Sequence, residues 1–254
     1  MATDNARLER EQEFHDRRFA EDSDRQEKVG KFYQITKSVQ QEKEKILLNS
    51  SREAKVIEYG CGTGSYAFKL AEHGAKSVTG IDISPVAIEK AKQKAIALGV
   101  EQKTSFEVMN AENLEFAPDS YDLICGSGIL HHLDLNLAID SIVKVLQPNG
   151  KAVFLEPLGH NFLINLYRHR TPSIRSEDEH PLLDKDLAFL GQHFHQVNIQ
   201  YFYLTSLAAS FVAGKSGFNT VLKSCELLDS VLLKLPLIKK QAWIVLIELS
   251  KPIK

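Results

Sequence analysis

Residues 54–157 alternate between short apolar runs and amphipathic helical segments, and this order restricts the fold more than any other feature. The runs that we interpret as strands are 54–60, 77–84, 105–112, 121–130 and 151–157. The segments between them that read as helices are 65–74, 84–99 and 138–150. Strands that alternate with helices favour a parallel sheet with helices on both faces, which is an α/β fold.

Local stop and start signals support these boundaries. Ser84 is a natural N-cap, Pro85 suits the first helical turn and Gly99 suits the end of the helix. The helix over 138–150 is expected to end at Pro148-Asn149-Gly150.

The flanks of this region are less regular. Residues 1–50 are rich in interspersed charges and contain no proline, which predicts an N-terminal helical extension. Residues 195–207 and 241–252 read as two further strands, and residues 207–240 between them as an apolar helical insertion. We therefore divide the chain into an extension (1–50) and a main domain (51–254), with a core (54–157), a cap region (158–240) and a last strand (241–250).

Composition excludes several classes of protein. The chain has 254 residues, 31 Lys and Arg, 33 Asp and Glu, and a net charge of −2, so no overall positive field attracts nucleic acid. Three scattered cysteines suggest neither a disulfide framework nor a zinc site. The charged N-terminus is not a signal peptide, and the longest uncharged run near the C-terminus, 201–214, is shorter than a membrane span. We expect a cytoplasmic protein.

The segment Glu58–Gly64 follows the first strand and opens a helix. Its glycines permit a tight turn and the close approach of a ligand, and the helix N-terminus offers free N–H groups. Asp82 ends the second strand, where a carboxylate accepts hydrogen bonds from both hydroxyls of a ribose. The loop and the acid together predict a cofactor that contains a nucleoside.

Two cofactors fit this pattern. The run Gly62–Ala67 satisfies the loose dinucleotide motif G-x-G-x-x-G/A, which keeps an NAD-dependent oxidoreductase open. The carboxylate of Glu58, however, would repel a pyrophosphate. It would attract the cationic amino-acid part of a different cofactor. Asn110-Ala111-Glu112 follows the third strand, where polar groups can read an adenine edge.

These motifs, in this order, resemble the class I S-adenosylmethionine-dependent methyltransferases, in particular methyltransferase domains of types 11 and 25. The resemblance rests on Glu58–Gly64, Asp82–Ser84, Asn110–Glu112 and the strand Tyr121–Gly126 that leads into Leu130-His131-His132, and it covers residues 54–157. It implies a Rossmann-like, seven-stranded, mostly parallel sheet whose last strand is antiparallel. It also implies that residues 1–50 close over the site as a lid.

The resemblance also implies a set of cofactor contacts. Glu58 would attract the amino group, Asp82 would hold the ribose and Ile83 would pack on the adenine. The full set assigned to S-adenosylmethionine, or to its product S-adenosylhomocysteine, is Glu58, Gly60, Cys61, Gly62, Gly64, Asp82, Ile83, Asn110, Ala111, Glu112 and Ser127.

Candidates for catalysis are His131, His132 and His160, because histidine suits a general base near neutral pH. Methyl transfer also depends on positioning, and a base is needed only when the acceptor must lose a proton. The pair His131-His132 has the alternative of capping a helix or contacting the cofactor. His193 and His195 lack a suitably spaced acidic ligand, so we expect no metal.

Candidates for acceptor binding lie in the flanks and at the end of the fifth strand: Tyr33, Glu156, Asn161, Arg168 and Arg175. The arginines would anchor a carboxylate or a phosphate, although internal ion pairs on a solvated loop explain them equally simply. The apolar segment 207–240 completes the core, walls an acceptor pocket or forms a dimer interface.

The function expected is methyl transfer to a small or medium-sized acceptor, such as a natural product, a peptide terminus or a lipid-like metabolite. Oxygen is favoured over nitrogen or carbon, because histidines and arginines could bind and activate a hydroxyl or a carboxylate. We expect a role in secondary metabolism. The alternatives are an N-methyltransferase, an NAD-dependent oxidoreductase and a non-catalytic binding protein on the same fold. The protein is expected to be a monomer or a homodimer.

Overall fold

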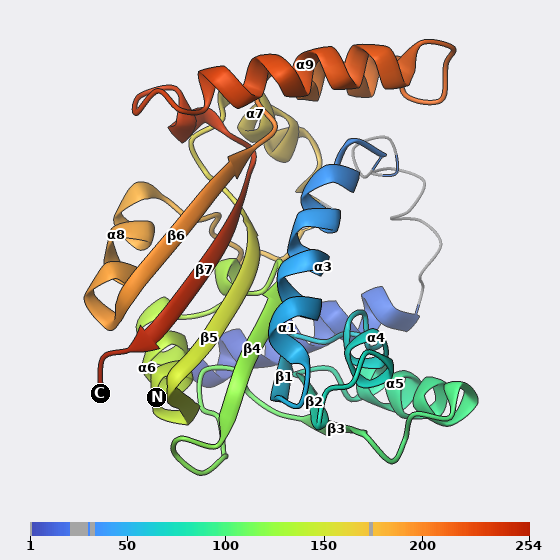
Figure 1. The fold of residues 1–254 in the computed structure, drawn as a ribbon, viewed down its shortest axis with the longest axis vertical. Helices are drawn as coiled ribbons and strands as arrows, with labels where there is room; N and C mark the ends of the chain where they lie inside the picture. Colours follow the sequence, from blue (N-terminus) through green and yellow to red (C-terminus); the bar gives the residue numbers. More distant parts are fainter. Residues whose placement is uncertain (1, 21–29, 31–33, 173–174) are drawn as a thin grey trace.

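A single seven-stranded sheet organises the chain (Figure 1). The computed structural model describes residues 2–20, 30, 34–172 and 175–254. The strands are β1 (Lys55–Tyr59), β2 (Ser77–Asp82), β3 (Thr104–Val108), β4 (Tyr121–Ser127), β5 (Leu146–Pro157), β6 (Phe194–Phe202) and β7 (Ile244–Pro252). Their order across the sheet is β3-β2-β1-β4-β5-β7-β6.

Helices connect and flank these strands. The α-helices are α1 (Ala2–Ala20), α3 (Lys37–Ser51), α4 (Ala67–Glu72), α5 (Pro85–Leu98), α6 (Leu135–Val145), α7 (Phe162–Arg170), α8 (Asp184–His193) and α9 (Phe218–Leu232). Three 3-10 segments are η1 (Leu130–His132), η3 (Thr205–Val212) and η4 (Lys239–Gln241).

The direction of the strands confirms the expected fold class. β1 pairs in parallel with both β2 and β4, and β4 pairs in parallel with β5. β7 lies antiparallel between β5 and β6, so the last strand alone opposes the rest of the sheet. The chain reverses its winding between β1 and β4, and ligands of open α/β sheets bind at such a switch point, beyond the carboxyl ends of the strands.

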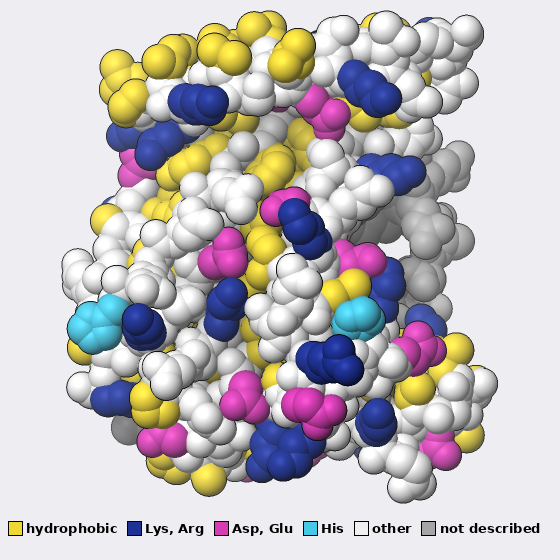
Figure 2. Space-filling view, viewed as in Figure 1, with side chains coloured by type: hydrophobic (Ala, Val, Ile, Leu, Met, Phe, Trp, Pro, Cys, Tyr) yellow, Lys and Arg dark blue, Asp and Glu magenta, His cyan; other side chains and the backbone are white. Residues whose placement is uncertain are grey.

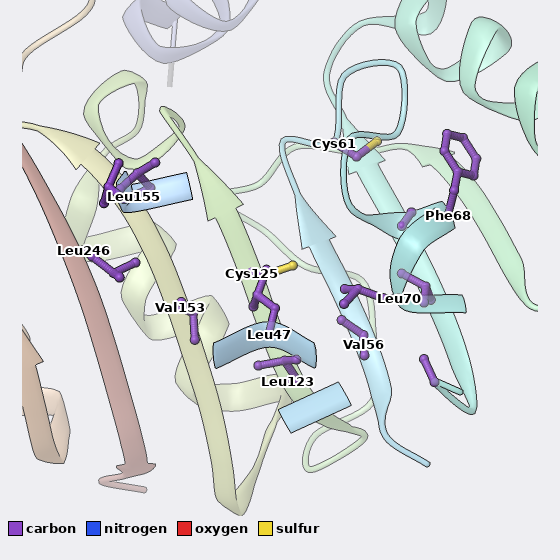
Figure 3. Packing of buried hydrophobic residues seen from close by; sticks show 14 of the residues in the cluster. Leu47, Val56, Cys61, Phe68, Leu70, Leu123, Cys125, Val153, Leu155 and Leu246 are labelled. Carbon is purple, nitrogen blue, oxygen red and sulfur yellow. The ribbon is translucent and has the colours of Figure 1, made fainter. Parts of the chain in front are cut away.

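Alternate side chains of the strands build two hydrophobic layers. Val56 of β1 faces one layer with α3, α4 and α5, whereas its neighbour Ile57 faces the other with α6 and α8. Figure 3 shows the first layer, where Leu47 of α3 packs beside Leu123 and Val153 of the sheet. The helices therefore cover both faces, as a parallel sheet with apolar strands requires.

The caps of α5 match the sequence signals, but the end of α6 does not. The Ser84 side chain accepts a hydrogen bond from the N–H of Ala87, and Gly99 adopts φ 68°. α6 ends at Val145 and Leu146 already begins β5, so the prediction of a helix to residue 150 was wrong. A proline disfavours helical geometry in the residue before it, so Pro148 ends the helix before Gln147.

The two helices before β1 differ in their surroundings. α3 is part of the core, because Val39 and Leu47 are fully buried and pack with the sheet. α1 packs against α5 and lies at the carboxyl ends of the strands. Within the predicted extension, α1 is thus the part that covers the site.

The segment between β6 and β7 is helical and exposes apolar side chains. Phe211, Leu227 and Leu237 are 84 %, 72 % and 81 % exposed. Figure 2 shows hydrophobic side chains along this end of the molecule, over α9. Among the described residues, no helix is both long enough and apolar enough to cross a membrane.

Candidate functional site

A cavity of about 380 Å³ opens at the carboxyl ends of β1, β2, β4 and β5, beneath α1. This volume is within the range of small-molecule sites. The predicted residues that line it are Gly60, Cys61, Gly62, Asp82, Ile83, Asn110, Ala111, Ser127, His131, His132, Glu156, Arg168 and Arg175. Glu58, Gly64, Glu112, His160 and Asn161 do not line it, and Tyr33 lies outside the described residues.

The glycine loop forms the floor of this cavity. Gly60 and Gly62 have φ values of 65° and 52°, which side chains disfavour. A Cβ at Gly60 would lie 2.9 Å from the Ile129 side chain, and one at Gly62 would lie 3.0 Å from the ring of Phe19. A side chain at either position would therefore be strained and would crowd Ile129 or Phe19 at the edge of the cavity.

Asp82 holds this loop from the end of β2. Its Oδ2 accepts a hydrogen bond of 2.8 Å from the N–H of Gly62, and its Oδ1 accepts one of 2.9 Å from Ser84. Each carboxylate oxygen has a second lone pair, so Asp82 can also accept bonds from a diol in the cavity.

Glu58 supports the helix that follows the loop. Its two oxygens accept hydrogen bonds of 2.8 Å from the N–H groups of Tyr66 and Ala67, at the start of α4. Burial raises the pKa of Glu58 to about 7, despite these bonds. The contact of Glu58 with a cofactor amino group stays a prediction.

Lys43 is a site residue that the sequence interpretation missed. It is fully buried, and its Nζ donates to the carbonyl of Gly126 at 2.7 Å and to the hydroxyl of Ser127. The same ammonium lies 4.4 Å from the centre of the Tyr66 ring. The spacing Val39-Lys43-Leu47 was the available signal, since residues four apart share one helix face.

The segment after β3 is anchored from several sides. Asn110 accepts from the N–H of Glu112 at 2.9 Å, and the Tyr59 hydroxyl donates to the carbonyl of Ala111. Glu112 accepts from the N–H of Asp134 at 2.7 Å and pairs with Arg7 of α1. Asn110 and Ala111 thereby reach the cavity while Glu112 faces α1.

Several polar contacts hold α1 over the cavity. Arg7 pairs with Glu112, Glu11 lies 3.1 Å from the Nδ1 of His132, and Asp16 accepts from the hydroxyl of Ser84. Phe14 and Phe19 of the same helix also line the cavity.

His131 and Glu156 form a buried pair beside the loop. The Nδ1 of His131 is 2.8 Å from Oε2 of Glu156. The N–H groups of Ile129 and Leu130 donate to the other carboxylate oxygen at 2.9 and 3.0 Å. Burial alone would raise the pKa of Glu156, but the bonds from His131 and these amides hold it below its ordinary value.

His132, unlike His131, faces α1. Its Nδ1 is near both Glu11 and, at 3.3 Å, the Ser176 hydroxyl, and burial lowers its pKa. Potential metal ligands meet in two groups, Glu11-His15-His132 and His131-His132-Glu179. Hydrogen bonds from His15 and His132 lower the pKa of Glu11, although burial of its carboxyl opposes this. Glu11 is therefore ionised beside both histidines. The expected absence of a metal remains a prediction.

Two predicted residues serve the framework in this structure. His160 accepts from the N–H of Asp184 at 3.1 Å. Asn161 caps α7 by accepting from Ile164 at 3.0 Å, and its amide donates to the carbonyl of Gln241 at 2.6 Å. His160 therefore lies outside the cavity as a partner of α8, and its catalytic role stays a prediction.

Sequence comparison identifies the family. A family model described as "Methyltransferase domain" matches residues 50–180, slightly more than half of the chain. The protein belongs to this methyltransferase family. The family uses S-adenosylmethionine as its cofactor, and Gly60, Gly62 and Asp82 line the cavity in which it would be held.

Curated relatives include further methyltransferases. The "Ubiquinone/menaquinone biosynthesis C-methyltransferase UbiE" of Geotalea daltonii is 31 % identical over 118 residues, which are 45 % of this chain and 49 % of that protein. The "Methyltransferase GfsG" of Streptomyces halstedii is 31 % identical over 105 residues, or 41 % and 38 % of the two chains. The match thus spans less than half of these relatives' length.

Solved structures share the fold. A Haemonchus contortus phosphoethanolamine-type N-methyltransferase in complex with S-adenosylhomocysteine superposes with a TM-score of 0.60, at 16 % identity over 84 % of this chain and 53 % of the other. The geranyl diphosphate C-methyltransferase of Streptomyces coelicolor gives a TM-score of 0.58, at 13 % identity over 82 % and 77 %.

Proposed function

We propose that this protein transfers a methyl group from S-adenosylmethionine to an oxygen atom of a small acceptor, with His131 as the general base. The supporting observation is the 2.8 Å contact between His131 and Glu156, both of which line the cavity that contains the glycine loop and Asp82. A buried histidine oriented by a buried carboxylate, next to a cofactor site, is an arrangement suited to removing a proton.

The orientation of His131 follows from its partner. Glu156 is an acceptor, so the His131 ring donates through Nδ1 and keeps a lone pair on Nε2. That nitrogen takes the proton of an acceptor hydroxyl, and the carboxylate stabilises the imidazolium that results. The bound cofactor supplies a methyl group made electrophilic by its sulfonium. The glycine loop and Asp82 hold that cofactor so that the acceptor oxygen lies in line with the methyl group.

Methyl transfer to carbon is the second candidate. Relatives and structural neighbours include proteins named as C-methyltransferases, and an activated carbon acceptor also loses a proton. Transfer to an amine needs no base, so the His131–Glu156 pair favours it least. The class of acceptor, a role in secondary metabolism and a cytoplasmic location remain parts of the proposal.

An acceptor screen tests this function. Phenols, hydroxy acids, carboxylic acids and amines are incubated with the protein and S-adenosylmethionine, and methylated products are detected by mass spectrometry and assigned to oxygen, nitrogen or carbon by NMR. We expect an O-methylated product, and we expect His131→Asn to lower kcat by about 10²–10⁴ with unchanged affinity for S-adenosylhomocysteine. His195→Asn is the matched control, because His195 is an exposed strand residue.

Glu156 is tested as a positioning residue. Glu156→Gln should lower kcat and shift its pH profile, because the ring loses the charge that stabilises its protonated form. A kcat that stays unchanged in both His131→Asn and Glu156→Gln contradicts the assignment of the base. A product methylated only on nitrogen contradicts the assignment of the acceptor atom.

A further inference from the structure

Arg168, in the last turn of α7, brings a cation into the cavity, where two of its buried nitrogens have no partner among the described residues. Its side chain lines the cavity, and its Nε and Nη1 atoms are buried yet form no hydrogen bond to any described residue. Buried guanidinium groups are normally paired with carboxylates or other acceptors, because desolvation of an unpaired charge is costly. The unused N–H groups therefore indicate a place for an anion.

Arg175 adds to the positive field at this point. Its Nη1 donates to Oε1 of Glu179 at 2.9 Å, while its buried Nε has no described partner. Burial and the nearby charge of Arg175 lower the pKa of Arg168 to about 10, although Glu179 opposes this. Arg168 hence stays charged at neutral pH. Arg168, Arg175 and Glu179 together carry a net charge of one positive unit.

The other carboxylates at the cavity are committed elsewhere. Glu156 bonds to His131, Asp82 bonds to the amides of Gly62 and Ser84, and Glu11 lies against His132. Among the described residues, none of them pairs with Arg168. An anion has to come from a ligand if the site is to be neutralised.

The location of Arg168 does not follow from helix stability alone. Basic residues often occupy the last turn of a helix, where they interact with its carbonyl groups. His169 and Arg170 occupy the same turn and are exposed. Arg168 differs from them because its Nε and Nη1 are buried in the cavity wall and bond to no carbonyl of the described residues.

Glu179 links the arginines to the base. An oxygen of its carboxylate lies within 4.8 Å of ring nitrogens of both His131 and His132. The same residue pairs with Arg175. A group bound at Arg168 and Arg175 is thus on the same side of the cavity as His131, with Glu179 between them.

We propose that the acceptor carries an anionic oxygen group, a carboxylate or a phosphate ester, that Arg168 binds beside Arg175 while the group to be methylated faces His131. The part of this inference that places the methylated group at His131 rests on the proposed function. Arg168 presents its N–H donors as a planar fork, which matches the geometry of both anions. The acceptor is therefore a molecule with two functional ends, one methylated and one recognised by charge.

Binding of simple anions tests the site independently of catalysis. The protein saturated with S-adenosylhomocysteine is titrated by calorimetry with inorganic phosphate, sulfate and benzoate, and with uncharged benzamide as the shape-matched probe for benzoate. We expect saturable binding of at least one anion, with no binding of benzamide. Arg168→Gln should weaken the anion by about tenfold or more, as expected for the loss of a charge-assisted pair.

Arg170→Gln is the matched control, since it removes an exposed arginine from the same helical turn. It should bind the anion as the unmodified protein does. Arg168→Lys separates charge from shape: it keeps the cation and loses the fork, so an intermediate affinity supports recognition by geometry. Unchanged affinity for S-adenosylhomocysteine and an unchanged Tm show that each variant is folded.

Three results overturn the inference: equal anion binding by the unmodified protein and Arg168→Gln, equal binding of benzoate and benzamide, or no saturable binding of any of the three anions. The proposed function fails in a different way, through the absence of an O-methylated product in the acceptor screen. The first experiment needs no turnover, so the two failures are distinguishable.

Discussion

Nη2 of Arg7 lies 2.5 and 2.6 Å from the two carboxylate oxygens of Glu112, a residue 105 positions away in the sequence. The contact joins α1 to the segment that borders the adenine side of the cavity. Arg7 also donates to the carbonyl of His132 at 3.1 Å. Arg7 thereby links α1 to both the Glu112 segment and the His132 segment.

Loss of the contact between Arg7 and Glu112 should lower the affinity for the cofactor. We expect Arg7→Gln to weaken binding of S-adenosylhomocysteine by about three- to tenfold, because a partly buried pair of charges contributes more than an exposed one. Calorimetry measures the affinity. Arg17→Gln, on an exposed turn of the same helix, should have no effect. Equal affinities of the two variants would show that α1 does not retain the cofactor.

Asp82→Ala should abolish most of the affinity for S-adenosylmethionine. The change removes a carboxylate that can accept two charge-assisted bonds from the ribose, and a loss of about 100-fold is expected. Asp122→Ala is the control, because Asp122 bonds to the N–H of Lys55 at the opposite end of the sheet. If Asp82→Ala binds the cofactor as before, the ribose assignment is wrong.

Lys43→Met should destabilise the protein although the new side chain is apolar and of similar length. It leaves the carbonyl of Gly126 and the hydroxyl of Ser127 without their donor, at a cost of about 1–3 kcal/mol. Chemical denaturation measures the free energy of unfolding. Lys45→Met changes an exposed lysine of the same helix and should be nearly neutral. An equally stable Lys43→Met variant would mean that the buried ammonium makes no net contribution.

Glu58 should make the stability fall as the pH rises from about 4.5 to about 7. Its pKa in the folded protein is about 7 against an ordinary 4.5, so the folded state binds the extra proton in this window. Complete deprotonation then costs about 3 kcal/mol of unfolding free energy. Glu58→Gln should flatten this slope, as measured by denaturation at a series of pH values. Parallel profiles of the two proteins would contradict the shift.

The sheet and much of the cofactor half could be predicted because they depend on local patterns. Apolar runs, the glycine loop and the acid after the second strand each reflect a constraint that acts within a few residues. The end of α6 was predicted too late, since Pro148 already acts on the residue before it and the helix stops at Val145, ahead of the run Pro148-Asn149-Gly150.

The acceptor half depends on contacts between distant residues, which one sequence does not reveal. Nothing in the charged N-terminal segment distinguishes Arg7 or Glu11 from their exposed neighbours. Lys43 looked like an ordinary surface lysine because burial of an ammonium is unusual. The prediction of Arg168 as a binding residue came from its position after the fifth strand, not from any sign that it would be buried without a partner.

α1 borders both halves of the cavity, with Phe19 above Gly62 and Glu11 against His132. We propose that α1 acts as a lid over both halves of the cavity. Donor and acceptor would then enter past the same helix, so each exchange would require the same movement of α1. We expect the opening of this lid, and not the transfer of the methyl group, to limit the rate of turnover.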